Sequence, residues 1–173
     1  FEIYNDYQNK NEPKNNIYDL KEVDYVDLSW LINKKNLDTN EYWDERIFLY
    51  FEAPDFSKRL KKNNKKIFIA KNIHTSHLGS KSHEEKYNFE AQLTRNWHYN
   101  WSRFYFLKKH HGYFAAIKKT FPILLKISKN YLLSLFLKKT AHDKTLVFAE
   151  ICGLISSYLN RPSDYRPYEK NKD

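Results

Sequence analysis

Residues 44–59 read DERIFLYFEAPDFSKR, and this stretch decides how the middle of the chain is expected to fold. The apolar run from Ile47 to Phe51 predicts a buried strand, because aromatic and β-branched residues favour strands. The proline that follows suits the first turn of a helix, where its missing N–H costs nothing. We therefore expect a short basic helix over Pro54–Asn64. Two carboxylates, Glu52 and Asp55, stand where the strand gives way to the helix.

These carboxylates allow two interpretations. Asp55 near a helix start would cap free N–H groups and interact favourably with the helix dipole. Alternatively, the two acids form a catalytic pair, since a carboxylate within reach of a hydroxyl group can take its proton. Arg59, four residues beyond Asp55, belongs either to such a site or to an ion pair with Asp55 on one helix face. The spacing leaves both interpretations open.

Composition limits the classes of protein to consider. The chain has 173 residues, which corresponds to one domain or part of one. Its 3 glycines offer no glycine-rich phosphate loop, and the single Cys152 excludes a disulfide framework and a cysteine zinc site and fits a reducing compartment. No apolar run reaches the ~18 residues of a membrane span. The chain begins at Phe1 rather than Met, so we expect it to be part of a longer protein.

Charge is distributed unevenly along the chain. Residues 1–57 carry 6 basic and 13 acidic side chains, whereas residues 58–139 carry 19 basic and 3 acidic ones, a balance of +16. This polarity predicts an anionic partner for the central part of the chain, such as a phosphorylated substrate, a membrane surface or nucleic acid. The alternative is a solvated, lysine-rich surface without a partner.

The sequence divides into three regions. Residues 1–20 are polar and lack periodicity, which predicts a loop or a poorly ordered lead-in. Residues 21–83 surround the short helix with predicted strands over Val23–Ile32, Lys66–Lys71 and Ile73–Leu78. Residues 84–173 have helical periodicity, and we expect helices over Glu84–Phe106, Tyr113–Lys139 and Ala141–Leu159, with a kink or boundary at Pro122.

The stretch Phe48–Arg59 resembles the acceptor-side signature of family 2 inverting glycosyltransferases, roughly FDE-x-FFLYFED-x-DL-x-x-R. Other segments follow in the family's order. VDYVDLSWLINKKNLD at 23–38 resembles the segment that lines the acceptor pocket, and HLGSKS at 77–82 resembles the element that closes the catalytic domain. RNWHYNWS at 95–102 resembles the post-catalytic helix of bacterial surface-polysaccharide enzymes. The resemblance extends over residues 20–167.

The resemblance implies an α/β fold: the C-terminal, acceptor-side part of a GT-A glycosyltransferase, with few strands and a short helix, followed by about three α-helices. The parent enzyme would transfer sugar from a nucleotide-sugar donor to a glycan or lipid-linked glycan acceptor in cell-surface polysaccharide synthesis. The family's Asp-x-Asp motif, which holds the donor diphosphate, has no match, since Asp24 and Asp27 are three positions apart. The donor half is therefore expected outside this chain, which alone would be inactive.

The resemblance also implies roles for individual residues. Glu52 and Asp55 are the expected catalytic acids, while Ala53 occupies the family's base position and cannot accept a proton. Arg59 is expected beside the acceptor. His77 is expected to bind Mg²⁺ or Mn²⁺ in the full-length parent, the alternative being a surface histidine at a strand end.

Three residues of the predicted long helix, Trp97, His98 and Trp101, are candidates for binding the acceptor. The alternative is a core cluster with one polar tip, which is the commoner arrangement for aromatic residues on a helix. The helix Tyr113–Lys139 combines apolar residues with many lysines, a composition typical of helices at anionic membrane surfaces. We therefore expect a cytoplasmic enzyme bound peripherally to the cytoplasmic face of the inner membrane. The alternative is a helix that packs on its neighbours with a lysine-rich outer face.

Two other function classes remain open. One is a catalytically degenerate interaction or membrane-docking domain, because the family's base position holds alanine. The other is a nucleic-acid-binding module that would use the basic central region. Dispersed lysines and the lack of a recognised nucleic-acid motif make this second alternative the weaker one, so no nucleic-acid partner is expected.

Overall fold

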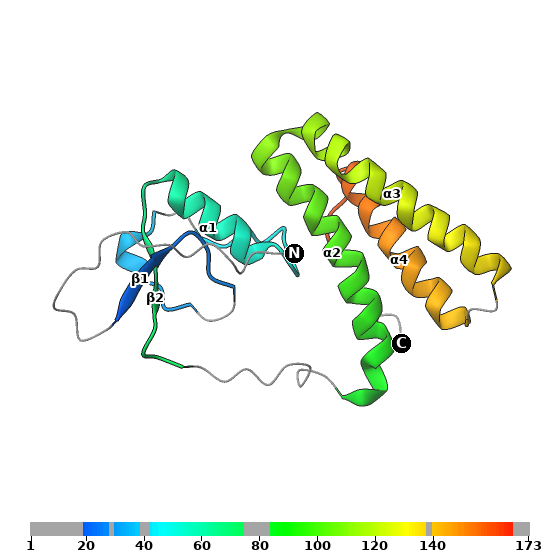
Figure 1. Cartoon of the computed structure of the whole chain (residues 1–173), viewed down its shortest axis with the longest axis horizontal. Coiled ribbons are helices and arrows are strands. Elements are labelled where there is room, and N and C mark those ends of the chain that lie inside the picture. Colours follow the sequence, from blue (N-terminus) through cyan, green and yellow to red (C-terminus); the bar gives the residue numbers. More distant parts are fainter. Residues whose placement is uncertain (1–18, 28–29, 39–41, 75–83, 138–139, 168–173) are drawn as a thin grey trace.

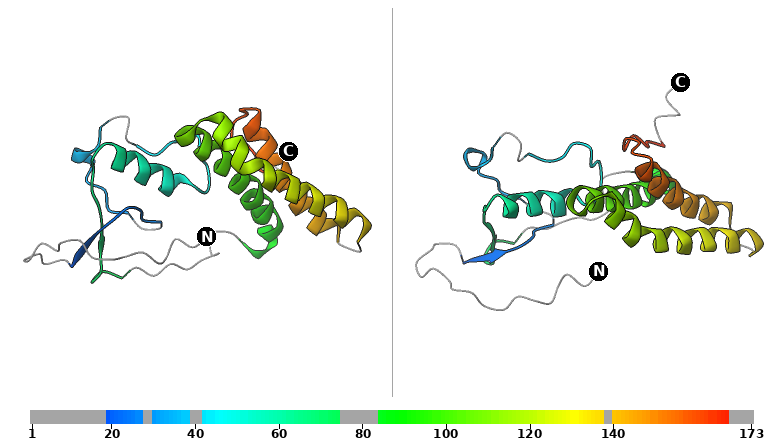
Figure 2. Two further views of the ribbon diagram at one scale, coloured as in Figure 1. Left: turned by 45° about the horizontal axis from the view of Figure 1, so that its top comes forward. Right: turned by 90° about the horizontal axis from the view of Figure 1, so that it is seen from above.

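A computed structural model describes residues 19–27, 30–38, 42–74, 84–137 and 140–167 of the chain. The molecule is elongated, with a two-stranded sheet and a short helix at one end and three long helices at the other (Figure 1). The same division is visible from two further directions (Figure 2). The prediction of few strands and a short helix followed by three helices is confirmed at this level, and the described chain is mostly helical.

The sheet consists of β1 (Leu20–Val23) and β2 (Ile67–Ala70), which pair antiparallel with Val23 opposite Ile67. Helix α1 (Glu52–Lys62) packs on this pair through Phe56 and Leu60, and the four side chains form one buried cluster. The amphipathic spacing of these helix residues, four positions apart, puts both on the face that meets the sheet. A short 3₁₀ helix, η1 (Lys34–Asn36), lies in the connection between β1 and α1.

The predicted strand from Ile47 to Phe51 is wrong. Ile47 is buried as expected, but this segment is a loop and belongs to neither strand of the sheet. The hydroxyl of Ser102 donates to the carbonyl of Leu49 at 2.8 Å, and the hydroxyl of Ser163 donates to the carbonyl of Arg46. Only Ile47 is buried, in the cluster of α2 and α4 side chains, whereas Phe48 is 47% exposed. An apolar run in a single sequence does not distinguish packing against helices from burial in a sheet.

The other strand predictions are confirmed only in part. Lys66–Lys71 contains β2, but the predicted strand Val23–Ile32 overlaps β1 at Val23 alone. Ile73 and its neighbour His74 are not in a strand, and the rest of that prediction lies outside the described residues. The HLGSKS segment at 77–82, including His77, also lies outside them, as do residues 1–18.

The helical predictions hold more closely. A 3₁₀ turn, η2 (Glu85–Tyr87), leads into α2 (Asn88–His111), and Gly112 separates it from α3 (Tyr113–Phe136). Helix α4 (Ala141–Tyr158) begins at Thr140, whose side chain accepts a hydrogen bond from the backbone N–H of Asp143. Helices α2 and α4 run in the same direction, and α3 runs opposite to both (Figure 1). Pro122, expected as a kink or boundary, lies inside the continuous α3.

The helices pack closely where α4 crosses α2. A Cβ atom on Gly153 of α4 would lie 2.1 Å from the carbonyl oxygen of Trp97 in α2, so only glycine fits at this contact. Around it, Leu93, Trp97, Trp101, Tyr105 and Ala149 form a buried cluster with Ile47. The loop before α1 is therefore anchored in the core of the helical part.

None of the helices among the described residues has the length and apolar composition required to cross a membrane.

Candidate functional site

A groove with a volume of about 1940 Å³ runs between the sheet, the segment after β1 and the start of α1. The described residues of the 23–38 segment, which resembles an acceptor-pocket lining, lie along this groove. The side chains that line it are mostly apolar and aromatic, and they include Val23, Tyr25, Val26, Asp27, Trp30, Leu37, Tyr50, Phe51, Glu52, Ala53, Phe56, Ile67 and Tyr99.

The chain enters α1 through two consecutive residues in the left-handed region, Tyr50 and Phe51, with φ of 65° and 67°. Bulky residues rarely adopt this conformation, and its strain persists only where surrounding contacts enforce it. Here both rings contact the ring of Tyr99 on α2, at centroid distances of 5.4 and 5.7 Å. The turn directs the next residue, Glu52, into the groove.

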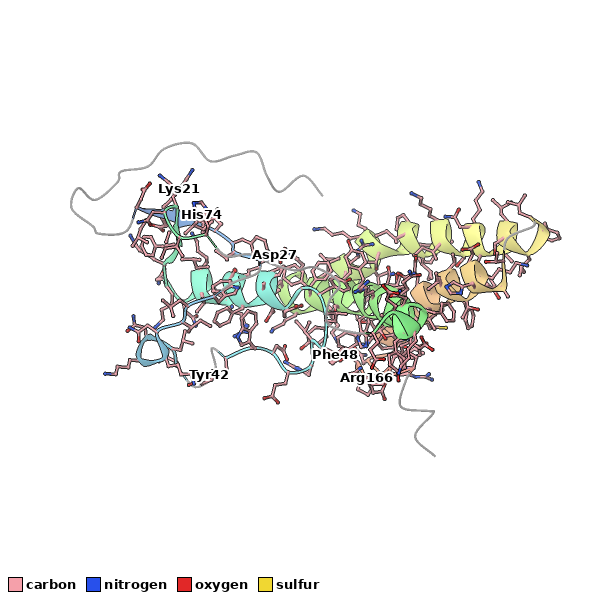
Figure 3. The ribbon with its side chains drawn as sticks, turned by 90° about the horizontal axis from the view of Figure 1, so that it is seen from below. Lys21, Asp27, Tyr42, Phe48, His74 and Arg166 are labelled. Atoms are coloured by element: carbon pink, nitrogen blue, oxygen red, sulfur yellow. The ribbon has the colours of Figure 1, made fainter. Side chains whose placement is uncertain are left out.

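Glu52 is the first residue of α1, and its Oε2 atom is buried without a hydrogen-bond partner among the described residues. Burial raises the pKa of this carboxyl group, and the nearby charge of Asp27 raises it further. Asp27 lies near the end of α1 that carries Glu52 (Figure 3). A carboxylate with a raised pKa holds a proton more readily than a solvated one, which is the property of a general base working near neutral pH.

Trp30, which also lines the groove, carries a second unsatisfied polar atom. The indole Nε1 of Trp30 is buried and has no hydrogen-bond partner among the described residues. The ring of Trp30 meets those of Trp43 and Phe56 edge-on, at centroid distances of 5.9 and 5.2 Å. Buried polar groups in native proteins nearly always have partners, which ordered water or a polar ligand can supply.

Asp55 occupies a different environment from Glu52. It is fully buried, and Arg59 Nε and Lys109 Nζ each lie 2.8 Å from Oδ2, while His110 Nε2 lies 2.8 Å from Oδ1. Burial alone would raise the pKa of this carboxyl group, but the hydrogen bonds from Lys109, Arg59 and His110 lower it. The ion pair with Arg59, one of the two interpretations of that residue, is observed. Asp55 does not cap the helix, because Phe51 is the N-cap residue and no side chain caps α1, but it does lie in the first turn, as the interaction with the helix dipole requires.

Asp44 completes this ion cluster, and sequence reasoning did not identify it. The guanidinium of Arg46 contacts its two oxygens at 2.8 and 3.0 Å, and Lys109 and the hydroxyl of Tyr105 each donate to Oδ2 at 2.8 Å. One ammonium therefore bridges Asp44 and Asp55. No spacing rule links residues 54 or more positions apart, so the sequence carried no signal for this contact.

These carboxylates do not fit a divalent metal. Both are already bonded to cations, from Arg46, Lys109 and Arg59, and a metal ion would have to displace those positive charges. Within the described ranges, no three His, Cys, Asp or Glu side chains gather closely enough to bind a metal.

Ala53 and Arg59 flank the two acids on α1. Ala53 is 4% exposed and is one of the residues that line the groove beside Glu52. Arg59 faces away, because its Nη2 donates to the carbonyl of Tyr42 at 2.7 Å and its Nε binds Asp55. The structure thus separates Arg59 from the groove that Glu52 and Ala53 line.

Trp97, His98 and Trp101 are all buried in the helical part, away from the groove lining. His98 Nε2 lies 3.0 Å from the carbonyl of Tyr165, and burial lowers the pKa of His98 to about 4. Arg166 contacts both His98 and Phe48. Its guanidinium lies 3.3 Å from the ring centre of Phe48 (Figure 3). The contacts of Trp97, His98 and Trp101 agree with the alternative interpretation, a core cluster with one polar tip.

No protein-family model, curated protein or solved structure matches this chain. The case for a function therefore depends on the groove, on Glu52 and on the order of the sequence motifs.

Proposed function

We propose that this chain is the acceptor-side part of an inverting family 2 glycosyltransferase that moves a sugar from a nucleotide-sugar donor to a glycan or lipid-linked glycan acceptor. The observation that supports this function best is Glu52, a half-buried side chain on an aromatic groove, whose Oε2 atom is buried and has no hydrogen-bond partner among the described residues. The order of the motifs from residue 23 to residue 102 agrees with it. The donor, and the Mg²⁺ or Mn²⁺ that accompanies it, would be held outside the described residues.

In the proposed reaction, an acceptor hydroxyl lies in the groove and attacks the anomeric carbon of the donor sugar. A new carbon–oxygen bond forms on one face as the bond to the nucleoside diphosphate breaks on the other, and Glu52 takes the proton of the hydroxyl. The raised pKa of Glu52 favours this transfer, because a base works best when its pKa lies near the operating pH. The ring faces of a sugar match the aromatic walls of the groove, which include Trp30.

Asp55 has a positioning role in this proposal. A carboxylate with three cationic or polar donors and a lowered pKa is a weak base. Its contacts with Lys109 and His110 fasten α1 to α2, and thereby fix the direction in which Glu52 points. Loss of Asp55 would then displace the base rather than remove it.

A second candidate function is a catalytically degenerate interaction domain, which Ala53 favours because it replaces the family's usual base. The test is release of nucleoside diphosphate by the full-length gene product that contains this chain, with nucleotide-sugars, a divalent metal and lipid-linked glycan acceptors. We expect release with the wild type and a loss of about 100-fold or more with Glu52→Gln, the typical effect of removing a general base. Glu45→Gln, which removes an exposed carboxylate outside the groove lining and keeps the base, serves as a control. Release unchanged by Glu52→Gln, or none with any donor, would refute the proposal.

A further inference from the structure

The outward face of α3 is apolar along its whole length. Phe114 and Phe136, near its two ends, are each 87% exposed, and Leu125 and Leu132, nearer its middle, are each 56% exposed. Such a concentration of exposed apolar side chains on one helix marks a surface that binds a partner. The side chains that make up this surface, here called the α3 face, are Phe114, Phe121, Leu125, Leu132 and Phe136.

The spacing of these residues puts them on one side of the helix. Phe114, Phe121, Leu125 and Leu132 are separated by seven, four and seven positions. At 3.6 residues per turn, they fall within an arc of about 40°. The buried residues Ala116, Thr120, Ile127 and Ser134 lie on roughly the opposite side, where α3 packs on α2 and α4.

Positive charge borders the α3 face. Helix α3 carries four lysines and neither aspartate nor glutamate over its 24 residues. All four are exposed, and Lys118 and Lys129 adjoin the apolar stripe, with Lys119 and Lys126 farther round the helix. An apolar stripe with a basic border and no acid is the pattern of helices that lie in the interface of an anionic membrane.

We infer that the α3 face binds an anionic lipid bilayer, with the axis of α3 parallel to the surface. Its phenylalanines and leucines would enter the boundary between headgroups and acyl chains, and its lysines would meet lipid phosphates. A second copy of the chain fits less well, because face-to-face packing of two α3 helices would oppose lysine with lysine and provide no acid on either helix.

The position of α3 in the molecule is compatible with docking. It lies on the helical part, at the other end of the elongated molecule from the sheet and the groove (Figure 1). A bilayer bound to the α3 face would thus leave the groove uncovered. The inference does not depend on the proposed transferase activity and is tested by binding alone.

The experiment is flotation of the full chain with two kinds of vesicle: phosphatidylcholine alone, and an equal mixture of phosphatidylcholine and phosphatidylglycerol. We expect flotation with the mixed vesicles and at least about tenfold weaker binding to the neutral ones, because each lysine near an anionic surface contributes to affinity. Lys118→Gln with Lys129→Gln should weaken binding to mixed vesicles by about tenfold. The exposed pair Lys34→Gln with Lys62→Gln makes the same change in charge on the other part of the molecule and should leave binding unaltered.

A double variant tests the apolar stripe. Phe114→Gln with Leu125→Gln should abolish flotation, while Phe148→Gln, which changes an exposed ring on α4, should not. Both residues of the stripe are exposed, so circular dichroism is expected to remain that of the wild type. Failure to float with anionic vesicles would overturn the inference, as would equal binding to neutral ones. Self-association lost in the double variant, without vesicle binding, would instead assign the α3 face to a second copy.

Discussion

The ammonium of Lys109, near the end of α2, lies 2.8 Å from the buried carboxylate of Asp55 in α1. The two residues are 54 positions apart, and their contact joins the sheet-and-helix part to the three long helices. Because the same ammonium also binds Asp44, one side chain bridges two acids that would otherwise repel each other.

Replacing Lys109 by methionine should destabilise the protein by about 3 kcal/mol, because it leaves two largely buried carboxylates with fewer cationic partners. Urea unfolding followed by circular dichroism measures the change. The matched control is Lys61→Met, which removes an exposed pair with Asp24 and should change stability by less than about 1 kcal/mol. Equal effects of the two substitutions would show that the buried cluster contributes no more to stability than an exposed ion pair.

As the pH falls from 6.5 to about 4, the free energy of unfolding should decrease because of His98. Burial lowers the pKa of His98 from 6.5 to about 4 in the folded protein. Between these pH values the unfolded chain therefore binds a proton that the folded protein does not bind. The contribution of His98 to the free energy of unfolding is fully present above pH 6.5 and is lost as the pH falls to about 4. It amounts to at most about 3 kcal/mol. Asp55 has a lowered pKa and loses its contribution only below the unfolded aspartate value of ~3.9.

Urea midpoints measured across this pH range, for the wild type and His98→Gln, test the prediction. The variant should lose most of the slope between pH 6.5 and 4, and His110, whose pKa burial also lowers, contributes to what remains. An unchanged slope in His98→Gln would contradict the assignment.

Glu52→Gln should raise the unfolding free energy at pH 7. Burial raises the pKa of Glu52 in the folded protein, so its charged form is disfavoured there relative to the unfolded chain. Glutamine has the same shape and carries no charge. A gain in stability together with the loss of nucleoside diphosphate release is the pattern expected of a catalytic residue. A variant less stable than the wild type would indicate that the carboxylate contributes to folding.

Ala53→Asp in the full-length gene product should raise the rate of nucleoside diphosphate release by about tenfold or more, because it adds a second proton acceptor beside Glu52. Ala53 lines the groove near the start of α1, where an acidic side chain also interacts favourably with the helix dipole. Ala53→Asn has a similar shape and cannot act as a base, so it should leave the rate unchanged. Equal rates in the two variants would exclude a role for this position in the chemistry.

Gly153→Ala should destabilise the protein by about 3 kcal/mol, since its Cβ would overlap the backbone of Trp97 and separate α4 from α2. Gly112→Ala is the comparison: its φ of 86° strains any side chain, but no atom lies within 4 Å. We expect Gly112→Ala to destabilise the protein by about 1 kcal/mol. Thermal unfolding of both variants measures the difference, and a tolerated Gly153→Ala would mean that the helices separate at little cost.

The sequence predicted elements whose signals are local. The three helices follow from periodicity and from breaks such as Gly112, and the pairing of Asp55 with Arg59 follows from their spacing on one helix. Ile47–Phe51 was predicted as a strand because an apolar run reports burial and not the partner against which it is buried. Lys109 and Asp44 could not be predicted as partners of Asp55, because contacts across more than 50 residues leave no periodic trace.

The long connections made by the loop before α1 also bear on the order of folding. Helices α2, α3 and α4 follow one another closely, whereas Ser102 reaches Leu49 across 53 positions and Tyr105 reaches Asp44 across 61. Pairing α2 with α3, and α3 with α4, closes only short loops and thereby brings α4 onto α2, so we expect the three helices to assemble first. The turn at Tyr50 and Phe51 would adopt its left-handed form only when it docks on α2. Glu52 would then acquire its buried setting at the last step of folding, and lose it at the first step of unfolding.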